Sequence, residues 1–86
     1  MKNKDILIKK IIYRSRHRGS KEMDLLLGEF VKRNIKLFNE DELNKLDLFL
    51  NIEDEVLLRY YNNDKIDTKI PSNTITKKFK TFKLKY

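Results

Sequence analysis

Residues 20–34 carry the most regular apolar spacing in the chain and restrict its fold more than any other stretch. Apolar side chains recur at i, i+3, i+4, i+7 and i+8, which places them on one face of an α-helix: Met23, Leu26, Leu27, Phe30 and Val31. Ser20 or Gly19 can cap this helix, and Glu22 and Asp24 lie in its first turns, where negative charge is favoured. Such a helix needs other helices to cover its apolar face.

Three further segments show helical spacing. Residues 4–16 carry an apolar stripe, a third helix can begin at the cap Asn39, and residues 53–62 have apolar and tyrosine side chains on one side. No stretch of four or more residues alternates cleanly enough to predict a strand. We therefore expect an all-α fold, a compact bundle of four or five short helices.

The end of the chain allows two interpretations. After Pro71, the side chains of Ile75, Phe79, Phe82 and Tyr86 recur at helical spacing, but interspersed threonines weaken the pattern. Residues 73–86 are therefore predicted to form either a basic C-terminal helix or a flexible tail. Residues 1–72 are predicted to form a single helical domain that folds without them.

The charge of the chain is unevenly distributed. The 86 residues carry a net charge of +7, and 15 of the 20 basic residues are lysine. Residues 1–21 have a net charge of +7 and residues 65–86 of +6, whereas residues 22–64 have a net charge of −6. Two basic ends suggest a small RNA- or DNA-binding domain, but the acidic middle would repel a nucleic-acid duplex.

The sequence offers no means of building a catalytic or metal centre. There is no cysteine, His17 is the only histidine, and the consecutive Glu40, Asp41 and Glu42 point in different directions around a helix. No apolar run approaches the roughly 20 residues of a spanning helix. We expect a cytoplasmic monomer without membrane segment, metal, stably bound cofactor or enzymatic activity of its own.

The turn between the first two predicted helices concentrates the chain's distinctive chemistry. Three arginines alternate ahead of a glycine that can adopt a positive φ, and two acidic residues follow. Guanidinium groups and a glycine that allows close approach suit docking to another protein. The predicted docking residues are Arg14, Arg16, Arg18, Gly19, Glu22 and Asp24. Gly28 lies inside residues 20–34, where a mid-helix glycine costs about 1 kcal/mol relative to alanine. It is predicted to allow close approach of a neighbouring helix; the alternative is that it is simply tolerated there.

This turn resembles that of the succinate dehydrogenase flavinylation factor family, the FAD assembly factors. The family carries Arg-Gly-x-x-Glu after a first helix, and Arg18-Gly19-Ser20-Lys21-Glu22-Met23-Asp24 fits that pattern. The likeness continues through Leu26-Leu27, Phe30, Phe38-Asn39-Glu40-Asp41-Glu42-Leu43 and Leu57-Leu58-Arg59-Tyr60. Two residues depart from it: Ser20 stands where many members have methionine, and Tyr60 where tryptophan is frequent.

The resemblance implies a small helical maturation factor. Such a factor binds the flavoprotein subunit of succinate dehydrogenase, with fumarate reductase a second candidate client, and promotes covalent attachment of the partner's FAD to one of its histidines. It also implies that Arg18, Gly19 and Glu22, with Asp24, form the docking site; Arg14 and Arg16 are added on the charge argument alone. Arg18 and Glu22 are expected to point outward toward the partner.

Overall fold

The computed structural model describes residues 3–62 and 70–84, and all regular secondary structure in them is helical. The elements in chain order are α1 (Asn3–Arg16), α2 (Lys21–Asn34), the 3-10 turn η1 (Ile35–Leu37), α3 (Glu40–Phe49), α4 (Asp54–Tyr61) and α5 (Thr74–Thr81). The prediction of an all-α bundle is confirmed. None of the helices in these residues is long and apolar enough to cross a membrane.

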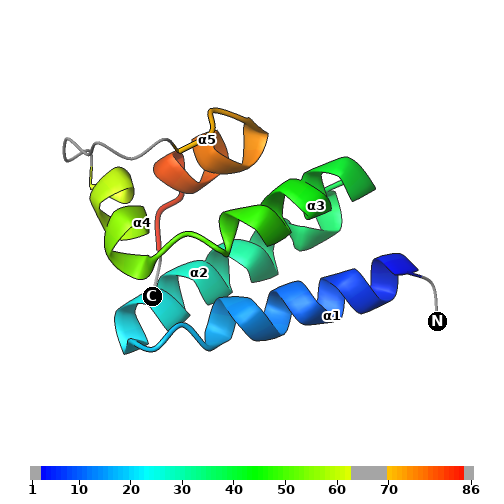
Figure 1. Cartoon of the computed structure of the whole chain (residues 1–86), viewed down its shortest axis with the longest axis horizontal. Helices are drawn as coiled ribbons and strands as arrows, with labels where there is room; N and C mark the ends of the chain where they lie inside the picture. The colour runs from blue at the N-terminus through cyan, green and yellow to red at the C-terminus, as the bar shows by residue number, and fades with distance from the viewer. Residues whose placement is uncertain (1–2, 63–69, 85–86) are drawn as a thin grey trace.

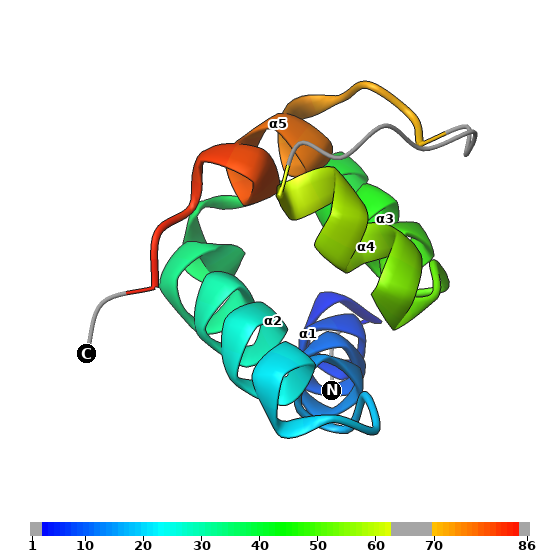
Figure 2. The same cartoon turned by 90° about the vertical axis from the view of Figure 1, so that its left-hand side faces the viewer.

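The arrangement of the helices brings two distant turns to one end of the molecule. α1 packs along α2, α3 contacts α1 and α5, and α4 contacts α5 (Figure 1). The α1–α2 turn and the start of α4 both lie at the end that faces the viewer in Figure 2. The start of α3 lies at the opposite end of the molecule (Figure 1).

The predicted helix starts are confirmed by their side-chain caps. The Ser20 hydroxyl accepts a hydrogen bond from the Met23 amide at 3.2 Å. The Asn39 side chain accepts from the Glu42 amide at 2.8 Å, and the Glu42 carboxylate accepts from the Asn39 amide at 3.1 Å. Each cap satisfies amides that have no acceptor within the helix, so the two starts are fixed locally by the sequence.

The apolar face of α2 lies at the centre of the core. Phe30 is completely buried, and its ring meets those of Phe79 and Phe82 edge-on, with centroids 5.4 and 5.5 Å apart. Phe79 also meets Phe49 of α3 edge-on at 5.2 Å. Aromatic pairs in this geometry add to the burial energy. One cluster of side chains therefore joins α2, α3 and α5.

The C-terminal segment forms part of this core. Ile75 and Phe79 of α5 are completely buried. The sequence predicted that residues 1–72 fold without residues 73–86, but removal of these two side chains would leave a hole in the core. A capping box between Asn73 and Thr76 offsets the weak helix propensity of the threonines. The helix ends at Thr81, and Phe82 packs on Phe30 from extended backbone. Tyr86, predicted on the same stripe, lies outside the described residues.

The burial of α5 can be tested with Phe79→Ala. Removing this completely buried ring should lower the free energy of unfolding by about 3–5 kcal/mol. Leu48→Ala is the control, because Leu48 is 67% exposed and its loss should change stability by under about 0.5 kcal/mol. Urea unfolding followed by circular dichroism measures both. Equal midpoints for the two variants would show that α5 contributes nothing to the core.

Candidate functional site

The α1–α2 turn is a bend that requires a left-handed glycine and has open space outside it. Gly19 has a φ of +108°, a conformation that side chains with a Cβ rarely adopt, as its position in the sequence predicted. A Cβ placed on Gly19 would meet no atom within 4 Å. The requirement for glycine therefore comes from the backbone, and the space beside it is free for another molecule.

Arg18 points into the protein, contrary to the expectation that it reaches out to a partner. Its Nε donates to Asp54 Oδ1 at 2.7 Å, its Nη1 donates to the Leu50 carbonyl, and its Nη2 donates to the Ile52 carbonyl at 2.5 Å. The side chain is only 10% exposed. Its guanidinium group thus satisfies two carbonyls of the connection between α3 and α4 and pairs with the first residue of α4.

Asp24 and Arg14 are also engaged in internal contacts. Asp24 Oδ1 accepts a hydrogen bond from the backbone amide of Arg18 at 2.5 Å, which fixes the turn to the second helix. Arg14 donates to Asp47 Oδ1 at 2.7 Å and to Asn51 Oδ1 at 2.5 Å, so it joins α1 to α3. Three of the six predicted docking residues therefore have structural contacts that the sequence did not reveal.

The remaining three predicted residues, Arg16, Gly19 and Glu22, are exposed. Within the described part of the chain, the carboxylate of Glu22 has no ion pair or hydrogen bond. Two neighbours missed by the sequence reasoning share this surface: the exposed Lys21, and Leu25, which is 41% exposed. Leu25 could have been found, because it lies outside the apolar stripe of α2. We call these five residues the exposed corner.

A hollow of about 350 Å³ adjoins the exposed corner. Its lining consists of Arg16, Lys21, Asp24, Leu25, Gly28 and Glu29. A Cβ on Gly28 would lie 3.2 Å from Arg16 Cγ, so the glycine makes room for the arginine side chain to lie across α2. The predicted close approach at Gly28 is confirmed, and the approaching group is the side chain of Arg16.

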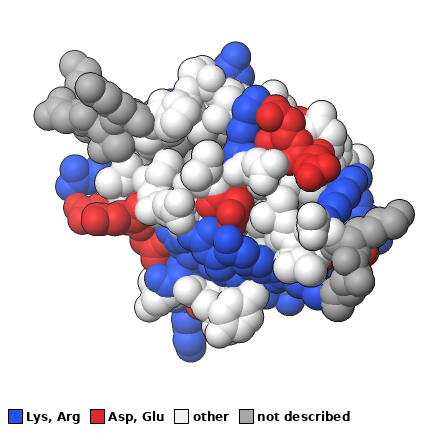
Figure 3. All heavy atoms as spheres, turned by 45° about the vertical axis from the view of Figure 1, so that its right-hand side comes forward, with Lys and Arg blue, Asp and Glu red and all other residues white. Residues whose placement is uncertain are grey.

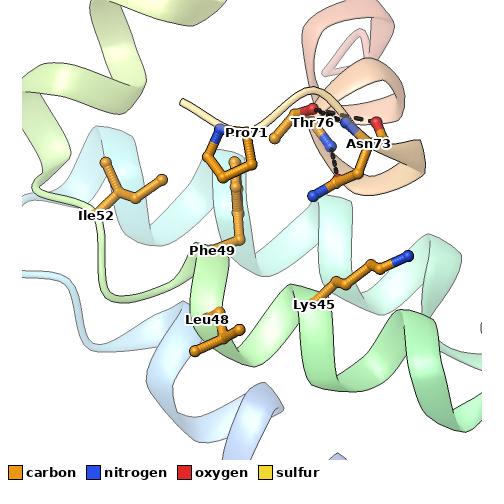
Figure 4. Close-up of a pocket in the computed structure, with 7 residues that line it drawn as sticks. All are labelled: Lys45, Leu48, Phe49, Ile52, Pro71, Asn73 and Thr76. Carbon is orange, nitrogen blue, oxygen red and sulfur yellow. Dashed lines mark hydrogen bonds between the residues drawn. The ribbon is translucent and has the colours of Figure 1, made fainter. Parts of the chain in front are cut away.

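A second hollow, of about 270 Å³, lies between α3 and the start of α5 (Figure 4). Leu48, Phe49, Ile52 and Pro71 supply most of its surface, with Lys45 at its edge. Its polar residues, Asn73 and Thr76, hydrogen-bond to each other in the cap of α5, as the dashed lines show (Figure 4). These bonds use the side-chain oxygens of both residues, Asn73 Oδ1 and Thr76 Oγ1.

Basic side chains form a band over α1, interrupted by a small acidic group (Figure 3). Asp47 lies between Lys10 and Arg14, at 3.2 and 2.7 Å, and Asp54 pairs with Arg18. The positive charge of the N-terminal segment is therefore partly neutralised within the molecule. Among residues 3–62 and 70–84, no three acidic or histidine side chains converge as metal ligands.

Comparison with known proteins agrees with the motif. A family model described as the flavinator of succinate dehydrogenase matches residues 9–83. Proteins named succinate dehydrogenase assembly factor 2, mitochondrial, are 40% identical in Caenorhabditis elegans over 57 residues and 36% identical in Arabidopsis thaliana over 58. The Saccharomyces cerevisiae protein is 48% identical over 42 residues. The matches to the C. elegans, A. thaliana and S. cerevisiae proteins cover 65%, 67% and 49% of this chain, respectively. They cover 48%, 31% and 26% of the length of those proteins, in the same order. No solved structure matches.

The fold is a small helical bundle in which Gly19 and Glu22 of the Arg-Gly-x-x-Glu motif are exposed, and the relatives it matches are assembly factors. The match of the family model over residues 9–83 defines the family. The chain belongs to the succinate dehydrogenase assembly factor family. The prediction of a cytoplasmic location is contradicted, because the relatives are named as mitochondrial proteins. The absence of a membrane-spanning pattern could not have revealed the compartment.

The structural role of Arg18 can be tested with Arg18→Ala. Loss of its guanidinium leaves two carbonyls and the Asp54 carboxylate without their donor, so the free energy of unfolding should fall by about 2–3 kcal/mol. Arg59→Ala is the control: Arg59 is 55% exposed and, among the residues that the structure describes, pairs with Glu55 alone, four residues earlier, so its loss should cost under about 0.5 kcal/mol. Thermal unfolding of both variants provides the comparison. If Arg18→Ala is no less stable than Arg59→Ala, the internal role is wrong.

Proposed function

We propose that this protein binds the flavoprotein subunit of succinate dehydrogenase and promotes covalent attachment of FAD to it. The observation that carries the proposal is the exposure of Gly19 and Glu22: no atom lies within 4 Å of a Cβ on Gly19, and the Glu22 carboxylate has no ion pair or hydrogen bond in the described part of the chain. The corner that bears them is made rigid by Arg18 and Asp24. A rigid, exposed corner suits docking, because little conformational freedom is lost on binding.

The chemistry of the attachment belongs to the flavin and the subunit, so this chain needs no catalytic group of its own. Its contribution would be to stabilise the subunit in a conformation where a histidine and the flavin are close and correctly oriented. Orientation of this kind can account for large rate increases without any acid, base or nucleophile from the helper. The FAD stays with the subunit throughout, and fumarate reductase remains a second candidate client.

The compartment follows from the client. The relatives are named as mitochondrial proteins, and we propose that this protein likewise acts in the mitochondrion, on the succinate dehydrogenase flavoprotein as it matures there.

The nucleic-acid alternative has lost part of its support. It rested on net charge, and three of the basic residues in the N-terminal segment, Lys10, Arg14 and Arg18, pair with carboxylates of α3 and α4. Steep salt dependence of binding to random oligonucleotides would restore that alternative.

Substitutions at Gly19 separate backbone strain from the loss of a close approach. Gly19→Ala and Gly19→Arg impose the same strained φ, but only arginine adds bulk to the space outside the turn. Covalent flavin in the subunit should fall by roughly tenfold more with Gly19→Arg than with Gly19→Ala. In-gel flavin fluorescence of cells carrying each variant measures this, with circular dichroism of the purified proteins as a fold control. Equal flavin attachment in the two variants would argue against close approach at Gly19.

Glu22→Ala tests the other exposed motif residue. Glu40→Ala is its matched control, since Glu40 is an exposed glutamate in the first turn of α3, at the opposite end of the molecule. Covalent flavin should decrease with Glu22→Ala and stay unchanged with Glu40→Ala, while the two variants melt at similar temperatures, because each loses one favourable charge at a helix start. Normal covalent flavin attachment in both single variants, Glu22→Ala and Gly19→Arg, would contradict the proposed docking site.

A further inference from the structure

The hollow beside the exposed corner holds two cationic side chains without a partner. Within the described part of the chain, neither the guanidinium of Arg16 nor the ammonium of Lys21 has a hydrogen bond or an ion pair. Both side chains are exposed, and they approach the hollow from different elements, α1 and α2. Together they offer several N–H donors that no internal acceptor uses.

The acidic groups of the same lining are already engaged. Asp24 accepts the Arg18 amide at 2.5 Å, and Glu29 pairs with Arg33 at 3.5 Å. The lining thus carries two positive and two negative charges, but both carboxylates already accept from other groups, so an anion that enters the hollow meets the two unengaged cations.

The position of Arg16 depends on a glycine that is otherwise unfavourable in a helix. Because Gly28 has no side chain, Arg16 Cγ can lie 3.2 Å from where a Cβ would be, and the arginine forms one wall of the hollow. Leu25, 41% exposed, supplies an apolar surface beside it. An acidic side chain has the matching chemistry: a short apolar stem and a carboxylate that can accept from both cations.

We infer that this hollow receives an aspartate or glutamate side chain of the flavoprotein subunit, bound by Arg16 and Lys21. The inference rests on the proposed function and deepens it. In this arrangement Gly19 and Glu22 contact the subunit at close range. The hollow, whose lining residue Lys21 is adjacent to Glu22 in the chain, binds the carboxylate of the subunit.

The decisive experiment measures binding of the full chain to the flavoprotein subunit, purified without covalent flavin, by isothermal titration calorimetry. The variants are Arg16→Ala, Lys21→Ala and their combination. Lys32→Ala is the matched control, since Lys32 is also exposed on α2 and without a partner in the described part of the chain, but lies in the last turn. We expect the double variant to bind at least about tenfold more weakly, and the control to stay within about twofold of the parent.

A chemical cross-link identifies the occupant. A carbodiimide couples an amine to a carboxylate in direct contact, so the parent complex should yield a peptide that joins Lys21 to an acidic residue of the subunit. Lys21→Arg keeps the charge but removes the amine, and should lose this cross-link while it still binds.

The outcomes separate the two proposals. Failure of the parent to bind the subunit would overturn the proposed function. Parent-like affinity of the double variant, with binding weakened by Gly19→Arg, would leave the proposed function standing and overturn the inference about the hollow. Loss of oligonucleotide binding in the double variant, with unchanged affinity for the subunit, would assign the hollow to nucleic-acid phosphates and overturn it too.

Discussion

The guanidinium group of Arg18 joins the two turns on which the shape of the docking end depends. It donates to two carbonyls in the connection between α3 and α4 and to the carboxylate of Asp54 at the start of α4. The backbone amide of Arg18 donates to Asp24. These bonds are charge-assisted and largely shielded from water, so they are stronger than surface ion pairs. They fix the position of Gly19 relative to the helices on either side, and the rest of the exposed corner depends on that position.

This arrangement divides the Arg-Gly-x-x-Glu motif into two roles. The arginine stabilises the protein through internal hydrogen bonds, and the glycine and glutamate are exposed and available to another molecule. A substitution of Arg18 is therefore expected to act through stability, whereas one of Glu22 is expected to act mainly through recognition. Separating these effects needs a measurement of folding beside every measurement of flavin attachment.

The sequence predicted what depends on local pattern and missed what depends on distant pairing. The stripe of α2, the Asn39 cap and the positive φ of Gly19 follow from spacing and residue type, and all are present. The partner of Arg18 is 36 residues away, and no local signal identifies Asp54 as that partner. The sequence likewise did not decide between a helix and a flexible tail around Phe79. The stability of this helix comes from burial against α2 and α3 and not from its threonine-rich sequence.

Hydrogen–deuterium exchange of this protein, free and bound to the flavoprotein subunit, tests the central claim most directly. The amides of Lys21 and Glu22, the first two of α2, have no acceptor within the helix and should exchange quickly in the free protein, whereas the Met23 amide donates to the Ser20 hydroxyl. The account predicts that binding slows exchange in residues 16–25 and leaves the start of α3, at the opposite end of the molecule, unchanged. If binding instead slows exchange around Glu40 and leaves exchange in residues 16–25 unchanged, the account is contradicted.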